Sequence, residues 1–172
     1  MSRVQLALNV NDIDEAVSFY TKLFGIEPAK RRPGYANFAV AEPPLKLVLL
    51  ENPGQGGTLN HLGVEVDSAD AVDAEQARLT QAGLAPVDER DSTCCYARQD
   101  KFWVTGAPGG ERWEIYTVLA DSATFWGQHG ERRWDAVEAE LDNAPAGQAT
   151  QSCGDPQAGS ATGDAATSVC CA

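Results

Sequence analysis

The chain has 172 residues, which is sufficient for one domain with a core or for two small modules that share one. Its formal net charge of −12 argues against nucleic acid as a partner, because phosphate binding requires a basic face. No apolar run approaches the ~20 residues of a membrane span, and the N-terminus lacks the pattern of a signal peptide, so we expect a cytoplasmic protein with no membrane partner.

The first half of the chain predicts one βαβββ module. Residues 4–10 alternate between apolar and polar side chains, which is typical of a half-buried strand. A helix with one apolar face follows, with Asp12 and Glu15 as a capping-box pattern at its start and Gly25 after its end. Three further strands are predicted at 27–32, 35–41 and 45–51.

The second half repeats this order. Residues 60–66 alternate like the first strand, and the next helix begins after Ser68 and stops at Gly83. The same offset separates Gln5 from His61 and Asp12 from Ser68. Three more strands are predicted at 85–89, 96–104 and 112–118. Because a repeat of this length is stronger evidence than any single motif, we predict an α+β fold with two paired βαβββ modules.

The composition changes after these modules. We predict a domain at 1–120, with modules at about 3–52 and 58–118, and a helical extension at 121–142 with its helix near 131–142. From residue 143, Gly, Ala, Ser, Thr and Gln dominate, which predicts a flexible tail over 143–172. The tail carries Cys153, Cys170 and Cys171, for which the sequence assigns no role. His129 lies outside both modules and is interpreted as a surface residue.

Two cysteines, Cys94 and Cys95, are adjacent in the sequence. The odd number of cysteines and the absence of an export signal favour reduced thiols over a disulfide framework. Adjacent residues on a strand point to opposite faces, so the pair requires a loop or bulge, and "RDST" (90–93) is interpreted as a connection. Three uses remain open: a strained vicinal disulfide, a soft-metal site, or capture of a trivalent arsenical.

The repeat, with "NVNDIDEAVSFYTKLFG", "NHLGVEV" and "GERWEIYT", resembles the vicinal oxygen chelate superfamily of glyoxalases, extradiol dioxygenases and drug-resistance proteins. The resemblance implies curved sheets around a cavity that holds a divalent metal, with Gln5, His61 and Glu114 as ligands. On the fourth strand the matching candidates are Leu47 and Val48, which cannot bind a metal. This departure counts against a glyoxalase-type isomerase. Asn9 and Glu65 share faces with Gln5 and His61 and are fallback ligands or hydrogen-bonding partners of the ligands.

One imidazole, one carboxylate and one further donor resemble the facial triad of non-haem Fe(II) oxygenases, with Gln5 in place of a second histidine. With "STCCYA", the chain resembles the organoarsenical carbon–arsenic lyases and the related cadmium-induced proteins. This resemblance implies an Fe(II)- and O2-dependent enzyme that cleaves trivalent methyl or aromatic arsenicals and releases arsenite. Cys94 and Cys95 would hold the arsenic.

Two other functions fit the same residues. The first is a non-catalytic resistance protein that binds As(III) or Cd(II) through its cysteines. The second is a different metal-dependent dioxygenase of the superfamily, which would leave Cys94 and Cys95 without a role. Taken singly, His61 and Glu114 are also compatible with ordinary structural roles on strands. Because such modules pair within one chain or between chains, both a monomer and a homodimer are compatible with the sequence.

Overall fold

The computed structural model describes residues 2–126. Their element order confirms the prediction of an α+β fold with two βαβββ modules. The first module contains β1 (Arg3–Val10), α1 (Ile13–Phe24), β2 (Lys30–Arg32), β3 (Tyr35–Val40) and β4 (Leu45–Glu51). The second contains β5 (Leu59–Glu65), α2 (Ala69–Gln81), β6 (Val87–Cys94), β7 (Ala97–Val104) and β8 (Trp113–Asp121).

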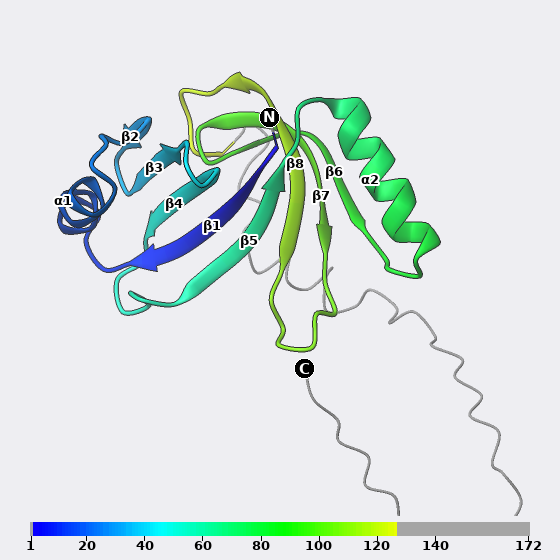
Figure 1. Cartoon of the computed structure of the whole chain (residues 1–172), viewed down its shortest axis with the longest axis horizontal. Coiled ribbons are helices and arrows are strands. Elements are labelled where there is room, and N and C mark those ends of the chain that lie inside the picture. Colours follow the sequence, from blue (N-terminus) through cyan, green and yellow to red (C-terminus); the bar gives the residue numbers. More distant parts are fainter. Residues whose placement is uncertain (1, 127–172) are drawn as a thin grey trace, which may run out of the picture.

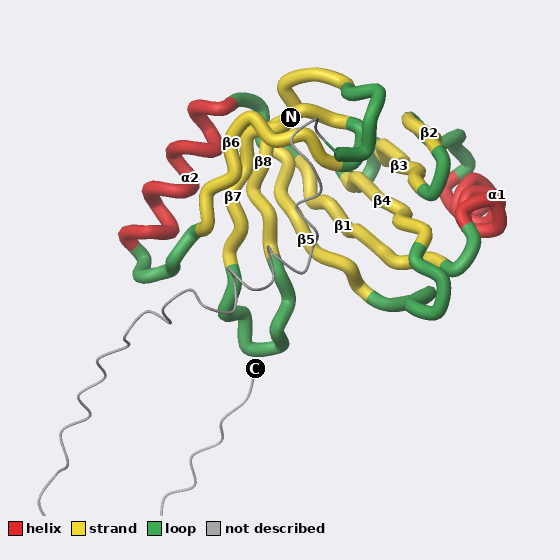
Figure 2. Tube along the Cα trace, turned by 180° about the vertical axis from the view of Figure 1, so that it is seen from behind, coloured by secondary structure: helices red, strands yellow, loops and turns green. Residues whose placement is uncertain are grey.

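All strands join one curved sheet in the order β2-β3-β4-β1-β5-β8-β7-β6 (Figure 1). Within each module the first and last strands pair in parallel, β1 with β4 and β5 with β8. The modules meet where β1 pairs antiparallel with β5. Figure 2 shows the sheet from behind, with β1 and β5 in the middle and β2 and β6 at the edges. The first strands of both modules are therefore neighbours at the centre of the sheet.

The helices begin and end at the residues that their sequences indicate. Asp12 caps α1 by accepting a hydrogen bond from the Glu15 backbone N–H at 2.8 Å. Gly25 ends the helix with a left-handed φ of 66°, which glycine adopts without a steric penalty. Ser68 caps α2 in the same way by accepting from Ala71 N–H. The caps therefore fix where each helix begins in the chain segment that connects the first and second strands of its module.

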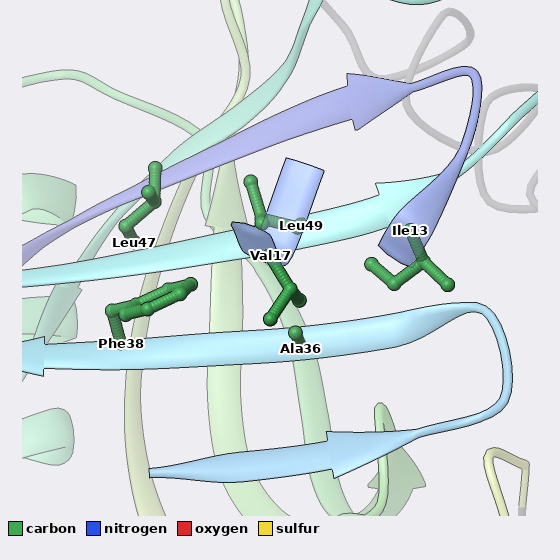
Figure 3. Close-up of a cluster of buried hydrophobic side chains, with 6 residues drawn as sticks. All are labelled: Ile13, Val17, Ala36, Phe38, Leu47 and Leu49. Carbon is green, nitrogen blue, oxygen red and sulfur yellow. The ribbon is translucent and has the colours of Figure 1, made fainter. Parts of the chain in front are cut away.

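Both helices cover the same face of the sheet, at its opposite ends (Figure 1). Leu6 of β1 packs in the α1 cluster, while Val64 and Ile115 pack with α2, and these residues share the face opposite Gln5 and Glu114. Figure 3 shows the buried cluster under α1. It consists of Ile13 and Val17 from the helix and Ala36, Phe38, Leu47 and Leu49 from β3 and β4.

The other face of the sheet is the more deeply buried at its centre. β1 alternates in burial as its sequence predicts, but its more deeply buried side is the one that carries the polar residues. Gln5, Ala7 and Asn9 are buried, whereas Leu6 and Leu8 are only partly buried under α1. The reason is that the sheet curls around its own concave face, so the polar side of β1 lines the enclosed space. Polar groups in such a position require partners, which makes this face the place to search for a site.

The remaining differences lie at strand ends and at the C-terminus. β2 begins at Lys30 rather than 27, and β8 continues to Asp121 rather than ending at 118. The predicted helix at 131–142, His129, and the tail at 143–172 with its three cysteines lie outside the described residues. No helix within residues 2–126 is long and apolar enough to cross a membrane.

The cluster under α1 predicts a strong contrast between two phenylalanines. Phe38→Ala removes a fully buried ring and should lower the free energy of unfolding by about 3–5 kcal/mol. Phe19→Ala is the matched control because the Phe19 side chain is 58% exposed on α1, and it should change stability by about 0.5 kcal/mol or less. Denaturant titration of both variants measures the difference, and equal losses would contradict the assigned packing.

Candidate functional site

Two of the predicted metal ligands meet across a glycine at the centre of the sheet. Gln5 on β1 is aligned with Gly63 on β5, and Gly63 is aligned with Glu114 on β8. His61 is two residues before Gly63, so its side chain points to the same face. A Cβ placed on Gly63 would lie 3.0 Å from Glu114 Cγ and 3.3 Å from Gln5 Cβ. Gly63 therefore leaves the space in which the flanking side chains converge.

The three predicted ligands are buried and in mutual contact. Gln5 Nε2 donates to Glu114 Oε1 at 2.5 Å and lies 3.0 Å from His61 Nε2. His61 Nε2 lies 3.2 Å from the same carboxylate oxygen. Their proximity is a fact of the structure, whereas their role as metal ligands stays a prediction.

A chain of amides orients the imidazole. Asn60 Nδ2 donates to Asn9 Oδ1 at 2.9 Å, which turns Asn60 Oδ1 toward the His61 ring. That oxygen lies 2.7 Å from His61 Nδ1 and can only accept, so Nδ1 carries the proton. His61 Nε2 is then the ring nitrogen that faces Gln5 and Glu114. Metal-binding histidines are commonly held in this way by a hydrogen bond at the other ring nitrogen.

The vicinal cysteines occupy a tight hairpin turn rather than a loop. The interpretation of "RDST" as a connection is wrong, because these residues continue β6 up to Cys94. Cys94 pairs with Ala97, and the two residues between them, Cys95 and Tyr96, have φ values of 58° and 61°. Positive φ at both central residues is the requirement of a type I′ hairpin turn. The turn places the two Sγ atoms 2.7 Å apart, with both cysteines free.

One enclosed cavity brings the thiol pair and the predicted metal ligands together. Its volume of about 20 Å³ is sufficient for a single water molecule or ion. Its lining consists of Gln5, Tyr35, Lys46, Val48, His61, Cys94, Cys95, Gln99, Lys101 and Glu114. All five candidate site residues are therefore in one place, although β6 and β1 are far apart in the sheet order.

The donor set fits a divalent metal if Gln5 takes part. Within residues 2–126, no three His, Cys, Asp or Glu side chains are grouped as metal ligands. His61 and Glu114 supply one nitrogen and one carboxylate, and Gln5, the predicted third ligand, would supply its amide oxygen. In the structure that oxygen points away, toward Tyr116 Oη at 2.5 Å. A half-turn of the amide brings it to the cavity, and the resulting set of three matches a metal site with open positions.

Lys101 is a buried cation that the sequence analysis missed. It is 2% exposed, and its Nζ lies 3.5 Å from Glu114 Oε2 and 3.8 Å from Glu89 Oε2. Burial alone would raise the pKa of Glu114, but Lys101 and His61 outweigh it and lower that pKa to about 2. Alternation in "ARQDKFWV" places Gln99 and Lys101 on one face of β7, which is the signal that could have revealed them.

The pKa values of the two thiols are shifted in opposite directions. The hydrogen bond from Cys95 lowers the pKa of Cys94, and the Lys101 ammonium adds to this against the cost of burial. The same bond raises the pKa of Cys95 together with burial. Of the two thiols, Cys94 is therefore the one that loses its proton more readily. A thiolate is the nucleophilic form of cysteine and the form that binds metals.

The other candidates have structural roles. Leu47 packs under α1, whereas Val48 faces the cavity, so the fourth-strand position in the site is apolar. Glu65 accepts hydrogen bonds from Arg3 and Tyr116 and forms an ion pair with Lys46. Asn9 acts through Asn60. Neither Glu65 nor Asn9 lines the cavity.

Residues 3–115 match the family model described as the Glyoxalase/Bleomycin resistance protein/Dioxygenase superfamily. The chain belongs to this superfamily. Its fold is also that of the Mn(II)-bound glyoxalase from Novosphingobium aromaticivorans, with a TM-score of 0.51 and 22% sequence identity. That alignment covers 78% of this chain and 44% of the other and supports the fold alone.

Two relatives within the superfamily are much more similar in sequence. The cadmium-induced protein CadI of Mycobacterium tuberculosis is 66% identical over 148 residues, which is 86% of this chain and 95% of CadI. The trivalent organoarsenical cleaving enzyme of Thermomonospora curvata is 60% identical over 126 residues, 73% of this chain and 83% of that enzyme. The predicted resemblance to both groups is confirmed.

The close approach at Gly63 leads to a testable prediction. Gly63→Ala places a methyl group against Glu114 and Gln5, so it should cost about 1–3 kcal/mol of stability through overpacking. It should also weaken metal binding, because the flanking side chains have to separate. Denaturant unfolding and anaerobic Co(II) titration measure the two effects. Unchanged Co(II) affinity would show that the convergence over Gly63 does not set the geometry of a metal site.

Proposed function

We propose that the protein cleaves the carbon–arsenic bond of trivalent organoarsenicals, with Fe(II) and O2, and releases arsenite. The observation that carries this proposal is the shared cavity, in which the Cys94–Cys95 pair faces the same space as Gln5, His61 and Glu114. A metal-dependent oxygenase of another kind would have no use for the two thiols. The name of the Thermomonospora curvata relative supports the assignment of substrate class.

The number of thiols matches the valence of the substrate. Trivalent arsenic forms three bonds and favours sulfur, and in a monosubstituted arsenical one of the three is already to carbon. Cys94 and Cys95 are the only cysteines in residues 2–126, and together they can replace two hydroxyl groups. Each thiol replaces one hydroxyl of the arsenical, and the two thiol protons leave with the two hydroxyls as two molecules of water. The carbon–arsenic bond then remains as the third bond.

The described residues hold this complex and balance its charge. Gln5, His61 and Glu114 would hold the iron, which when bound supplies the chemistry that makes O2 reactive. Lys101 balances the buried negative charge of Glu114 and favours ionisation of Cys94, so that both groups can act in a buried site. Fixed positioning of two reactants can itself lower a barrier by several kcal/mol.

The reaction balances without a further oxidant or reductant when the substituent is methyl. CH3As(OH)2 and O2 together contain the atoms of formaldehyde and arsenous acid. The arsenic stays trivalent, and the electrons that reduce O2 come from the carbon. One O2 should therefore be consumed for each arsenite and each formaldehyde formed.

Sequestration is the second candidate function, and CadI is the observation that favours it. CadI is described as cadmium-induced and is very similar to this chain. In this role the thiol pair would bind Cd(II) or As(III) and catalyse nothing.

The two candidates are separated by one experiment. The purified full-length protein is loaded with Fe(II) anaerobically and given trivalent methylarsenical, and then air is admitted while O2 and arsenic species are followed. Arsenite that forms only with both iron and O2, in equal amount to the O2 consumed, supports cleavage. Tight binding of the methylarsenical without arsenite supports sequestration and contradicts the proposed enzyme.

The thiol pair predicts a loss of turnover without a loss of metal. Cys94→Ser and Cys95→Ser each leave a single sulfur for the arsenic, so turnover should fall to about one hundredth of wild type or less. Bound iron per chain should not change, because neither cysteine belongs to the predicted ligand set. Cys153→Ser, which removes a thiol from the predicted tail, is the matched control. Wild-type turnover in either of the first two variants would refute the assigned substrate site.

A further inference from the structure

Tyr116 is a fully buried tyrosine that hydrogen-bonds to Gln5. Among the predicted ligands, Gln5 is the one that turns a non-coordinating atom, its amide nitrogen, to the cavity. Tyr116 lies on β8, two residues after Glu114, and is 0% exposed. Its hydroxyl donates to Gln5 Oε1 at 2.5 Å and lies 2.9 Å from Glu65 Oε2. Lys46 Nζ donates to the same Oη at 3.0 Å.

The phenol has one proton and two acceptors for it. The Tyr116 hydroxyl lies within hydrogen-bonding distance of Gln5 Oε1 and Glu65 Oε2, and it can donate to only one of them at a time. The oxygen also has two lone pairs, of which Lys46 uses one. Tyr116 can therefore donate either to Gln5 or to Glu65, and in the second case its remaining lone pair is free to accept.

The Gln5 amide has to rotate, and its hydrogen bond with Tyr116 has to reverse, before its oxygen can bind a metal. In the structure its Nε2 faces Glu114 and His61, and an N–H donor cannot coordinate a cation. Rotation of the amide turns Oε1 to the cavity and Nε2 to Tyr116. An N–H group that is buried there needs an acceptor, because buried donors without partners are rare and costly.

We propose that Tyr116 is the positioning residue that lets Gln5 become a metal ligand, by reversing the hydrogen bond between them. When a divalent metal binds, Gln5 Nε2 donates to Tyr116 Oη and Tyr116 donates to Glu65. Lys46 continues to donate to the hydroxyl, so every polar group of the network keeps a partner in both states. This inference rests on the metal site of the proposed function.

The two orientations of the Gln5 amide determine whether Tyr116→Phe should raise or lower the affinity for metal. In Tyr116→Phe, the metal-free orientation keeps the contacts of Gln5 Nε2 with Glu114 and His61. It loses only the hydroxyl that donates to Gln5 Oε1. The metal-bound orientation leaves the amide N–H buried against a ring edge, without an acceptor. The variant should therefore disfavour the metal-bound orientation and weaken metal binding by about tenfold.

A pair of tyrosine variants tests the inference. Tyr116→Phe is compared with Tyr35→Phe in anaerobic Fe(II) and Co(II) titrations of the full chain. Tyr35 is the matched control because it is also buried beside the cavity, and its hydroxyl accepts from Asn37 Nδ2 at 2.8 Å rather than from a predicted ligand. We expect about tenfold weaker binding for the first and wild-type affinity for the second. Wild-type affinity in both variants, or equal losses in both, would overturn the inference.

A second measurement needs no variant and remains decisive if Tyr116→Phe does not fold. In the wild-type protein labelled with ¹⁵N, the Gln5 side-chain amide protons should show NOEs to the His61 ring before Zn(II) is added and to the Tyr116 ring afterwards. Zn(II) that binds without this change would overturn the inference and leave the metal site intact. If neither Zn(II), Co(II) nor Fe(II) binds, the metal site of the proposed function is itself wrong.

Discussion

The convergence of Gln5 and Glu114 over Gly63 is the constraint on which the rest of the site depends. Antiparallel pairing of β1 with β5 and parallel pairing of β5 with β8 place the three residues in one row. Any side chain at the middle position would hold the outer two apart. The repeat of the βαβββ module therefore does more than build a sheet, because it brings the first strand of one module and the last strand of the other to either side of one small residue.

Burial of this row explains the charges around it. A carboxylate in an enclosed space is stable only with partners, and Lys101 and His61 supply them for Glu114. Lys101 also lowers the pKa of Cys94, although the hydrogen bond from Cys95 has the larger effect. The ammonium thus stabilises the charged forms of two groups that belong to different parts of the site.

Much of the fold and part of the site could be predicted from the sequence, because local chemistry determines them. The caps at Asp12 and Ser68 predicted the helix starts. The repeat predicted equivalent strand positions for Gln5 and His61, and the resemblance to the superfamily added Glu114. The hairpin at Cys95 and Tyr96 was missed because turns of this type normally contain Asn or Gly. Lys101 was missed because its burial depends on the curvature of the whole sheet. The alternation of β7 places Gln99 and Lys101 on one face, but it does not show that this face is the buried one.

The central claim is that the thiol pair holds trivalent arsenic beside the predicted metal ligands. The most direct test is the arsenic K-edge X-ray absorption spectrum of the Co(II)-loaded full-length protein with trivalent methylarsenical, prepared without oxygen. The account predicts two sulfur neighbours and one carbon for arsenic, and loss of both sulfur neighbours in the Cys94→Ser/Cys95→Ser double variant while Co(II) stays bound. Arsenic without sulfur neighbours, or with the same sulfur neighbours in the double variant, would contradict it.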